Sequence, residues 1–182
     1  MRRLILFRHG KAETTPLTGG DRERRLNERG RVDSVRTAQW LATAGYSPDL
    51  VLLSPSVRTR STCDCALPSF PGAAVETRDG LYLGGMEEIM DEVEATPADA
   101  ATVMVVGHNP GLQELAVELA VQAGAEAEQI ERMNDGFPTS TACILDLEGR
   151  RPMALEAIYE PPRKGEGAPR WVFIRQRAGG PA

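Results

Sequence analysis

The chain has 182 residues, with 21 Lys and Arg against 26 Asp and Glu, which gives a formal net charge of −5. An acidic chain is a poor candidate for sequence-independent binding to nucleic acid, because such binding needs a net basic face. The charge is distributed unevenly, since residues 1–60 hold 12 basic and 6 acidic side chains and residues 61–160 hold 4 and 19. The composition therefore still allows a local anion site in the first third of the chain.

Length and hydropathy predict one soluble globular domain that spans residues 1–182. The longest purely apolar runs, such as residues 4–7, contain four residues, whereas a transmembrane helix needs about 20. Arg8 interrupts the apolar start of the chain before it reaches the length of a signal-peptide core. We therefore expect a cytoplasmic protein that does not associate with membranes.

Apolar, β-branched runs alternate with amphipathic stretches, which is the pattern of a parallel sheet covered by helices. Strands are expected at residues 4–7, 50–53, 75–77, 102–106, 142–147 and 154–159. Asn27 is expected to cap a helix that ends at Gly45. Ser54 is expected to cap a second helix with Pro55 at its first position, and a further helix follows Pro110. The predicted fold is a three-layer α/β/α architecture with a mostly parallel central sheet.

The chain holds only two histidines, and each directly follows a predicted strand. His9 comes after the first strand, next to Arg8, and His108 comes after the fourth. Arg58 lies in the first turn of the helix after the second strand, where a helix N-terminus favours an anion. Because ligands of open α/β sheets bind outside the carboxyl ends of the strands, we expect these two arginines and two histidines to converge. A bound phosphoryl group would offset the repulsion among them.

Two other interpretations of the histidines stay open. Each ring, taken singly, also fits an ordinary loop residue that bonds to a backbone carbonyl. Metal binding is the second alternative, but two histidines without a third ligand at suitable spacing fall short of the usual ligand set. Neither a metal nor another cofactor is therefore predicted. The cysteines are expected to be reduced packing residues: Cys63, Cys65 and Cys143.

Three motifs, in this order and at these strand ends, resemble the signatures of the histidine phosphatase superfamily, whose fold is described as phosphoglycerate mutase-like: Arg8-His9-Gly10, Ser54-Pro55-x-x-Arg58 and Gly107-His108-Asn109. The resemblance covers most of the chain, from residue 3 to about residue 150. The small size and the segments 8–13, 26–30 and 138–140 resemble the SixA-type phosphohistidine phosphatases.

This resemblance implies that His9 is the nucleophile and that Arg8, Arg58 and His108 hold the phosphoryl oxygens. These roles suit the reaction, because phosphoryl transfer asks mainly for positioning and positive charge. Guanidinium groups stay charged and present forked donors. His108 can either donate to a phosphoryl oxygen or pass a proton to the leaving group, and the sequence does not separate these roles.

Residues beside these motifs extend the candidate site. Lys11 and Asn109 are substrate-binding candidates, although Lys11 fits an exposed loop lysine equally well. Residues 14–25 and 161–169 are expected to be loops. The arginines of the first loop are expected to be solvated at the rim of the pocket, with recognition of an acidic partner as the alternative: Arg22, Arg24 and Arg25.

Larger members of the superfamily carry an acidic residue, after the third strand, that protonates an alcohol leaving group. Acidic side chains of the corresponding region recur on a predicted helix, as expected for a solvated face: Glu87, Glu88, Asp91, Glu92 and Glu94. No general acid can be assigned. An imidazole leaving group, whose pKa is roughly 6.5, is therefore favoured over an alkoxide, which needs an acid worth about 10²-fold to 10⁴-fold in rate.

We therefore predict a hydrolase, a phosphatase that acts on phosphohistidine in a protein such as a phosphotransfer domain. One alternative is a phosphomonoesterase of the same fold that acts on a small phosphorylated metabolite. Another is a non-catalytic module that only recognises phosphate. The presence of both His9 and His108 argues against the module.

Overall fold

The computed structural model describes the whole chain except residues 17, 98, 150, 163–164 and 176–182. Seven strands form one sheet in the order β3-β2-β4-β1-β5-β6-β7. The four strands from β3 to β1 run parallel, and β5, β6 and β7 continue the sheet in antiparallel pairs. The strands are β1 (Arg3–Arg8), β2 (Leu50–Leu53), β3 (Ala74–Thr77), β4 (Thr102–Gly107), β5 (Ala142–Glu148), β6 (Arg151–Glu160) and β7 (Trp171–Ile174).

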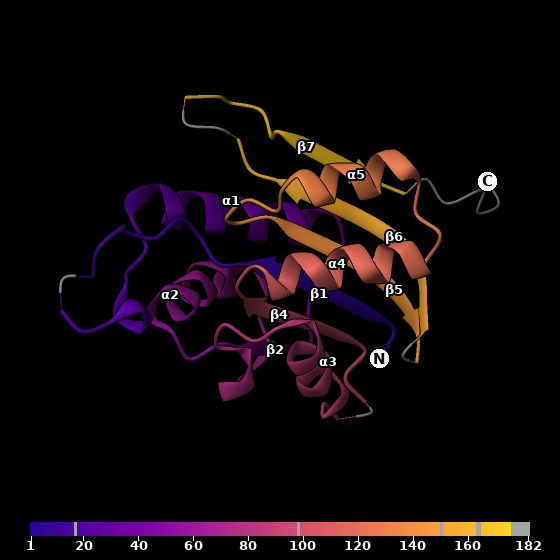
Figure 1. Cartoon of the computed structure of the whole chain (residues 1–182), viewed down its shortest axis with the longest axis horizontal. Helices are drawn as coiled ribbons and strands as arrows, with labels where there is room; N and C mark the ends of the chain where they lie inside the picture. The colour runs from indigo at the N-terminus through magenta and orange to yellow at the C-terminus, as the bar shows by residue number, and fades with distance from the viewer. Residues whose placement is uncertain (17, 98, 150, 163–164, 176–182) are drawn as a thin grey trace.

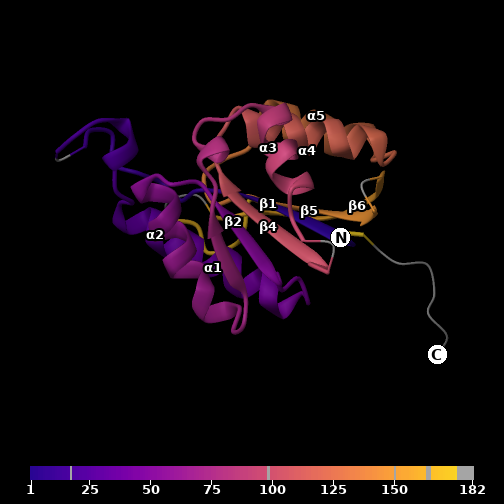
Figure 2. The same ribbon diagram turned by 90° about the horizontal axis from the view of Figure 1, so that it is seen from below.

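Helices cover both faces of the sheet, as the sequence predicts (Figures 1 and 2). One face carries α1 (Glu28–Thr43) and α2 (Val57–Ala66). The other carries α3 (Met86–Glu94), α4 (Gly111–Gln122) and α5 (Ala127–Asp135). Short 3₁₀ turns lie at Asp21–Glu23 (η1), Leu67–Ser69 (η2) and Asp79–Leu81 (η3). The architecture is therefore α/β/α in three layers.

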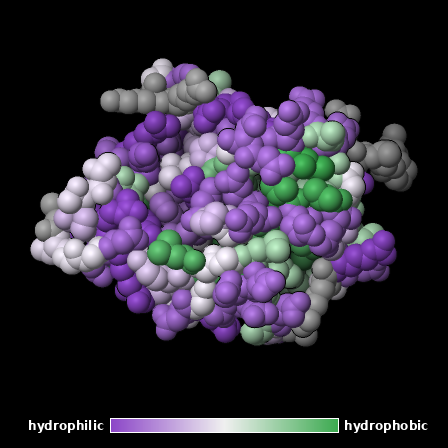
Figure 3. Space-filling model, in the orientation of Figure 1, coloured by the Kyte–Doolittle hydropathy of each residue, from purple (hydrophilic) through white to green (hydrophobic). Residues whose placement is uncertain are grey.

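The central strand β1 shows why the sheet is buried on both sides. Leu4 and Leu6 pack in the core under α3, α4 and α5, whereas Ile5 and Phe7 pack in the core under α1 and α2. Successive side chains of a strand point to opposite faces, so an unbroken apolar run fills both cores at once. The face seen in Figure 3 is mainly hydrophilic, with a larger apolar patch in the region of α4 and α5 and a smaller one in the left half of the view.

The register of the parallel strands places the functional motifs at one level of one edge. Arg8 of β1 pairs with Gly107 of β4, so that His9 and His108 both follow at the next position. Val106 of the same strand pairs with Leu53 of β2, directly before Ser54. The backbone N–H of His9 then donates to Gly107 O at 3.1 Å. Residues far apart in the chain thus meet at the carboxyl edge.

The helix predictions are confirmed except at the start of α2. Asn27 caps α1, since its side chain accepts a hydrogen bond from Gly30 N at 2.9 Å. Gly45, with φ +80°, follows the end of this helix in the left-handed region. The prediction that Ser54 caps α2 is wrong, because Ser56 is the N-cap and Pro55 lies outside the helix. Ser54 is left free for another partner.

The sequence analysis missed α5 and β7. α5 is polar overall and buries one side chain, Met133, although Glu126 and Gln129 form a capping box. β7 is a four-residue edge strand with alternating half-buried and exposed side chains. Neither element carries much hydrophobic signal. No helix in the described part of the chain has the length and apolar character that crossing a membrane requires.

Candidate active site

Two buried histidine rings lie against each other at the carboxyl edge of the parallel strands. The ring centroids of His9 and His108 are 5.1 Å apart, and the rings meet edge to face at 60°. Their exposed fractions are 8% and 2%. The structure thus brings together the two histidines that the sequence singled out.

A backbone carbonyl fixes the protonation of the His9 ring. Nδ1 of His9 lies 2.8 Å from Gly10 O, and because a carbonyl can only accept, Nδ1 carries the proton. Burial lowers the pKa of His9 to about 4; the Gly10 carbonyl opposes this shift, and the charges of Arg58, Arg8 and, more weakly, Arg24 add to it. His9 is therefore neutral near pH 7, with a lone pair on Nε2.

His108 is oriented by a serine hydroxyl. Its Nε2 lies 2.8 Å from Oγ of Ser54, which is fully buried. Its Nδ1 is buried without a hydrogen-bond partner among the residues that the structure describes. Burial and the neighbouring charges of His9 and Arg58 lower the pKa of His108 to about 3. When Ser54 donates to Nε2, Nδ1 carries the proton and becomes a free donor.

Arg58 reaches the site from the first turn of α2. Ser56 caps this helix by accepting from Thr59 N, so that the helix N-terminus and the guanidinium lie together. The Arg58 side chain is 1% exposed. Its Nη1 donates to Asp21 O at 2.7 Å and its Nη2 donates to Asp21 Oδ2 at 2.9 Å. Its Nε is buried and has no partner within the described ranges.

Arg8 is held from the opposite side of the site. Its Nη1 donates to Phe137 O, and its Nε is buried without a partner among the described residues. Burial lowers the pKa of Arg8. The backbone N–H of Ser140 donates to the carbonyls of Arg8 and His9, both at 3.1 Å. Ser140 adopts φ +63°, a conformation that a serine rarely holds without support from its surroundings.

Glycines allow the strand end to sit directly on α1. A Cβ on Gly10 would lie 2.5 Å from Gly30 O, and a Cβ on Gly30 would lie 2.1 Å from Lys11 O. Both distances are shorter than any real contact, so the two backbones need glycine to approach this closely. The N–H of Gly10 also donates to Thr62 Oγ1 at 2.9 Å. The backbone beside His9 is therefore fixed from two helices.

The site thus collects buried donors that lack acceptors. Within the described part of the chain, Nε of Arg8, Nε of Arg58 and Nδ1 of His108 have no partner. Buried polar groups are almost always paired, and an unpaired one is costly. A tetrahedral oxyanion placed against Nε2 of His9 would supply the missing acceptors. The arrangement is suited to phosphoryl transfer.

Comparison with known proteins agrees with this geometry. The family model described as the histidine phosphatase superfamily (branch 1) matches residues 4–100. The chain belongs to the histidine phosphatase superfamily. This membership, with the solved structures below, identifies an enzyme of the phosphatase or mutase type. The fold is phosphoglycerate mutase-like, since a phosphoglycerate mutase from Plasmodium falciparum, 16% identical, matches with a TM-score of 0.52 over 79% of this chain and 82% of that one.

Similar proteins come from a plant and from bacteria. An uncharacterized chloroplastic protein of Arabidopsis thaliana is 32% identical over 133 residues, which cover 65% of this chain and 59% of that protein. The match thus spans less than two thirds of the plant protein. A protein provisionally assigned as the phosphohistidine phosphatase SixA from Nakamurella multipartitia is 31% identical, with a TM-score of 0.74 over 86% of this chain and 94% of that one. A protein with the same provisional assignment from Agrobacterium tumefaciens is also 31% identical, with a TM-score of 0.70 over 80% and 91%.

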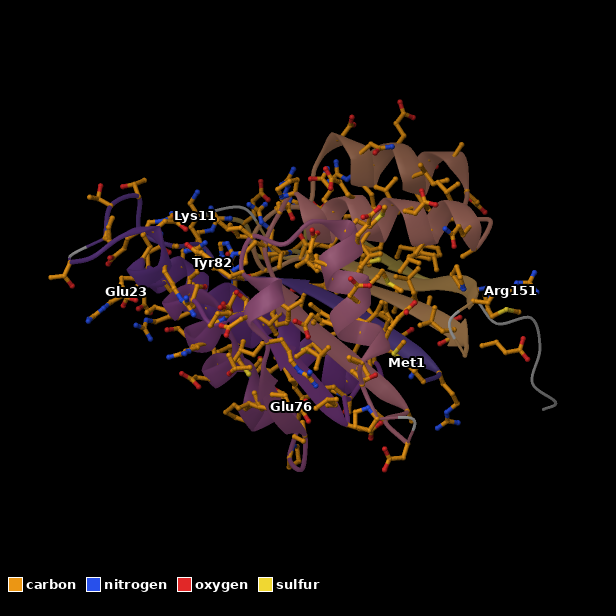
Figure 4. The ribbon with its side chains drawn as sticks, turned by 60° about the horizontal axis from the view of Figure 1, so that its bottom comes forward. Met1, Lys11, Glu23, Glu76, Tyr82 and Arg151 are labelled. Carbon is orange, nitrogen blue, oxygen red and sulfur yellow. The ribbon has the colours of Figure 1, made fainter. Side chains whose placement is uncertain are left out.

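The two additional candidates, Lys11 and Asn109, lie in different surroundings. Lys11 is exposed and is seen in the same half of the view as Tyr82, away from Met1 (Figure 4). Asn109 is half-buried, and its Nδ2 donates to Phe137 O at 3.1 Å. Arg8 donates to the same carbonyl. Asn109 therefore contributes to the support around Arg8.

The acidic residues considered as general acids for superfamily chemistry lie on α3. This helix buries Ile89 and Val93, and it exposes Glu87 and Glu88. Glu92 forms an ion pair with Arg78 at 3.7 Å. No contact between these carboxylates and the two histidines occurs among the described residues. The expectation of an outward acidic face holds for Glu87, Glu88, Asp91 and Glu94, which are exposed, whereas Glu92 is half-buried.

Two residues of the site escaped the sequence analysis. Tyr82, which follows η3, sets the edge of its ring against His108, with centroids 5.7 Å apart at 89°. Its hydroxyl donates to Oδ2 of Asp21 at 3.0 Å. Asp21 lies on the loop whose arginines were expected to be solvated. That expectation is wrong for Arg24, which is half-buried and pairs with Asp21 at 2.8 Å.

Proposed function

We propose that this protein is a phosphatase that transfers a phosphoryl group to Nε2 of His9 and then to water, and that its substrate is phosphohistidine in a protein. The observation that carries the proposal is the neutral His9 ring in a site with three buried nitrogen atoms that lack hydrogen-bond partners among the described residues. Structural similarity to proteins provisionally assigned as phosphohistidine phosphatases supports the substrate class.

The reaction proceeds in two steps. In the first step the lone pair of His9 Nε2 attacks phosphorus, the new N–P bond forms, and the N–P bond to the substrate imidazole breaks. Arg8, Arg58 and His108 donate to the phosphoryl oxygens and stabilise the charge on them. In the second step water attacks phosphorus, the His9–phosphorus bond breaks, and inorganic phosphate leaves. The proton lost by water is carried away by phosphate or solvent, and His9 returns to its neutral form.

The identity of the leaving group follows from the acids at hand. A neutral imidazole, whose conjugate acid has a pKa of roughly 6.5, departs without much help when the other ring nitrogen of the substrate carries a proton, which the imidazole keeps as it leaves. An alkoxide needs a proton donor worth about 10²-fold to 10⁴-fold. His108 is a weak candidate for that role, because its pKa of about 3 keeps it neutral at pH 7. These conditions favour phosphohistidine over a sugar phosphate. The proposed steps use no metal, so a chelator should leave turnover unchanged.

The nucleophile is tested with His9→Gln. We expect turnover of a His-phosphorylated phosphotransfer domain to fall about 10³-fold or more, with a small change in Tm. A ³²P label should appear on acid-labile phosphohistidine in the wild type and should be absent from the variant. Glu88→Gln is the matched control, since Glu88 is exposed on α3, and it should keep full activity.

The same assay distinguishes the alternatives. Faster turnover of a panel of sugar phosphates than of the His-phosphorylated domain would favour the small-molecule phosphomonoesterase. Vanadate binding without turnover of either substrate would favour the non-catalytic module. Unchanged turnover by His9→Gln would overturn the nucleophile assignment.

A further inference from the structure

The connection between β1 and α1 includes η1, which holds Arg58. Asp21, in η1 of this loop, accepts two hydrogen bonds from the Arg58 guanidinium, one at its backbone oxygen and one at Oδ2. The two residues are 37 positions apart in the chain, and η1 contacts α2. The guanidinium is therefore fixed by hydrogen bonds from both Nη atoms. Its Nε remains without a partner among the described residues.

The Asp21 carboxylate is itself held by two further side chains, Tyr82 and Arg24. Its Oδ2 also accepts from the Tyr82 hydroxyl at 3.0 Å, and its Oδ1 accepts from Nε of Arg24 at 2.8 Å. Arg24 in turn donates to Glu13 O at 3.1 Å, which ties η1 to the chain just after β1. The hydrogen bonds from Tyr82 and Arg24 outweigh the effect of partial burial and, with Arg58, hold the pKa of Asp21 below its ordinary value. The carboxylate is thus ionised and directed at Arg58.

Charge explains why Arg58 needs this partner. A guanidinium that is 1% exposed has lost its water, and burying a charge is costly unless it is paired. The Asp21 side chain is 46% exposed and keeps part of its hydration, so the pair costs less than two fully buried ions. A guanidinium carries five N–H donors, and Asp21 uses one on each Nη. The remaining donors stay available for phosphoryl oxygens.

We propose that Asp21 is the positioning residue of Arg58, and that Tyr82 connects this ion pair to His108 through its hydrogen bond to Asp21 and its ring contact with His108. This inference rests on the proposed function, because it gives Asp21 a role only if Arg58 binds the phosphoryl group. It gives η1 a part in the catalytic apparatus, whereas the sequence analysis expected the neighbouring arginines at the rim of the pocket. When negative charge develops on the phosphoryl oxygens in the transition state, an Arg58 that is already held in place does not have to reorient.

The test compares Asp21 with a neighbour on the same turn. Asp21→Ala should lower kcat for p-nitrophenyl phosphate about tenfold and weaken vanadate inhibition by a similar factor, with KM changed less. Asp21→Asn keeps an oxygen acceptor and should recover part of the loss. Glu23→Ala is the matched control, because Glu23 is an exposed acidic residue two positions along η1 (Figure 4). It should stay within about twofold of wild type.

A double-mutant cycle decides whether Asp21 acts through Arg58. In an Arg58→Ala background, Asp21→Ala should change vanadate affinity by less than about twofold, because there is no guanidinium left to position. A full additional loss there, or an equal loss in Glu23→Ala, would overturn the proposal. Tighter vanadate binding by Asp21→Ala would also overturn it, since Asp21 would then compete with the oxyanion.

His9→Gln, measured in parallel, separates the two proposals. An active His9→Gln enzyme would refute the proposed function itself. An inactive His9→Gln enzyme with an unchanged Asp21→Ala enzyme would refute only the positioning role. A fall in Tm of Asp21→Ala that Asp21→Asn repeats, without a change in kcat at permissive temperature, would show that Asp21 serves the fold alone.

Discussion

Buried charged side chains on β6 and at the carboxyl edge of β1 and β4 differ in how their polar atoms are paired. On β6, Glu160 is 2% exposed and pairs with Arg132 at 3.1 Å and with Arg170 at 3.7 Å. At the carboxyl edge of β1 and β4, by contrast, Arg8 and Arg58 each keep a buried Nε without a partner in the described chain. A buried charge with protein partners is satisfied by the fold itself, whereas a buried donor without an acceptor leaves room for a ligand.

The largest expected effect is the difference in kcat/KM between Arg58→Ala and Arg132→Ala, which change one arginine from each region. Arg58→Ala should lower kcat/KM about 10²-fold or more, because a donor to the transferring group is lost. Arg132→Ala should leave kcat/KM within about twofold and lower the free energy of unfolding by about 1–2 kcal/mol, since Glu160 loses one of its partners. Steady-state kinetics and urea denaturation measure the two quantities. Equal effects on activity would abolish the distinction between the regions.

Two serines near Arg58 sharpen the comparison within the active region. Ser54→Ala removes the hydroxyl that fixes the His108 ring, and kcat should fall about tenfold because the ring can then populate the wrong tautomer. Ser56→Ala removes the cap of α2 and should cost about 1 kcal/mol of stability. A larger loss of kcat in Ser56→Ala than in Ser54→Ala would contradict the assignment of Ser54 to His108.

A change of pH is expected to have the smallest effect on activity, and the effect predicted here is on the free energy of unfolding. The pKa values of His9 and His108 lie at about 4 and 3, below the ordinary 6.5. Between pH 6.5 and 4 the unfolded chain therefore binds more protons than the folded one, so the free energy of unfolding falls as pH falls through this window. Above about pH 7 these two groups contribute no slope.

NMR titration checks this prediction directly, because the chain has only two histidine rings. Both sets of ring signals should stay unshifted from pH 8 down to about pH 5. Denaturation of His108→Gln should show a weaker dependence on pH than the wild type between pH 6.5 and 4. A ring that titrates near 6.5 would contradict the burial that sets these pKa values.

The sequence identified functional residues where they directly follow a recognisable strand. The strand before His9 is an unbroken apolar run, so both the strand and the residue at its end are visible. The same holds for His108. Ser54 was misassigned because Ser54-Pro55 has the form of a helix start, while Ser56, two residues later, carries out the capping. The choice between two adjacent caps depends on tertiary contacts that the local sequence does not contain.

The remaining site residues depend on long-range contacts. Tyr82 and Asp21 are 61 positions apart and meet through one hydrogen bond between two irregular segments. Neither segment has a period from which its direction could be inferred. α5 escaped notice for a related reason, because a helix that buries only Met133 has the composition of a polar loop. Residue type alone could not distinguish Arg24, which pairs with Asp21, from its exposed neighbours.

The contact between Gly10 and Gly30 has a consequence for tolerance to mutation. Neither residue has a side chain with which to take part in chemistry, yet any Cβ at either position would enter the backbone of the other segment. A library that replaces each residue in turn and selects for turnover should therefore find Gly10 and Gly30 as intolerant as His9. Alanine, the smallest possible replacement, should already be rejected there. In such a map, the positions required for activity would include Gly10 and Gly30, whose contribution is that they lack a side chain.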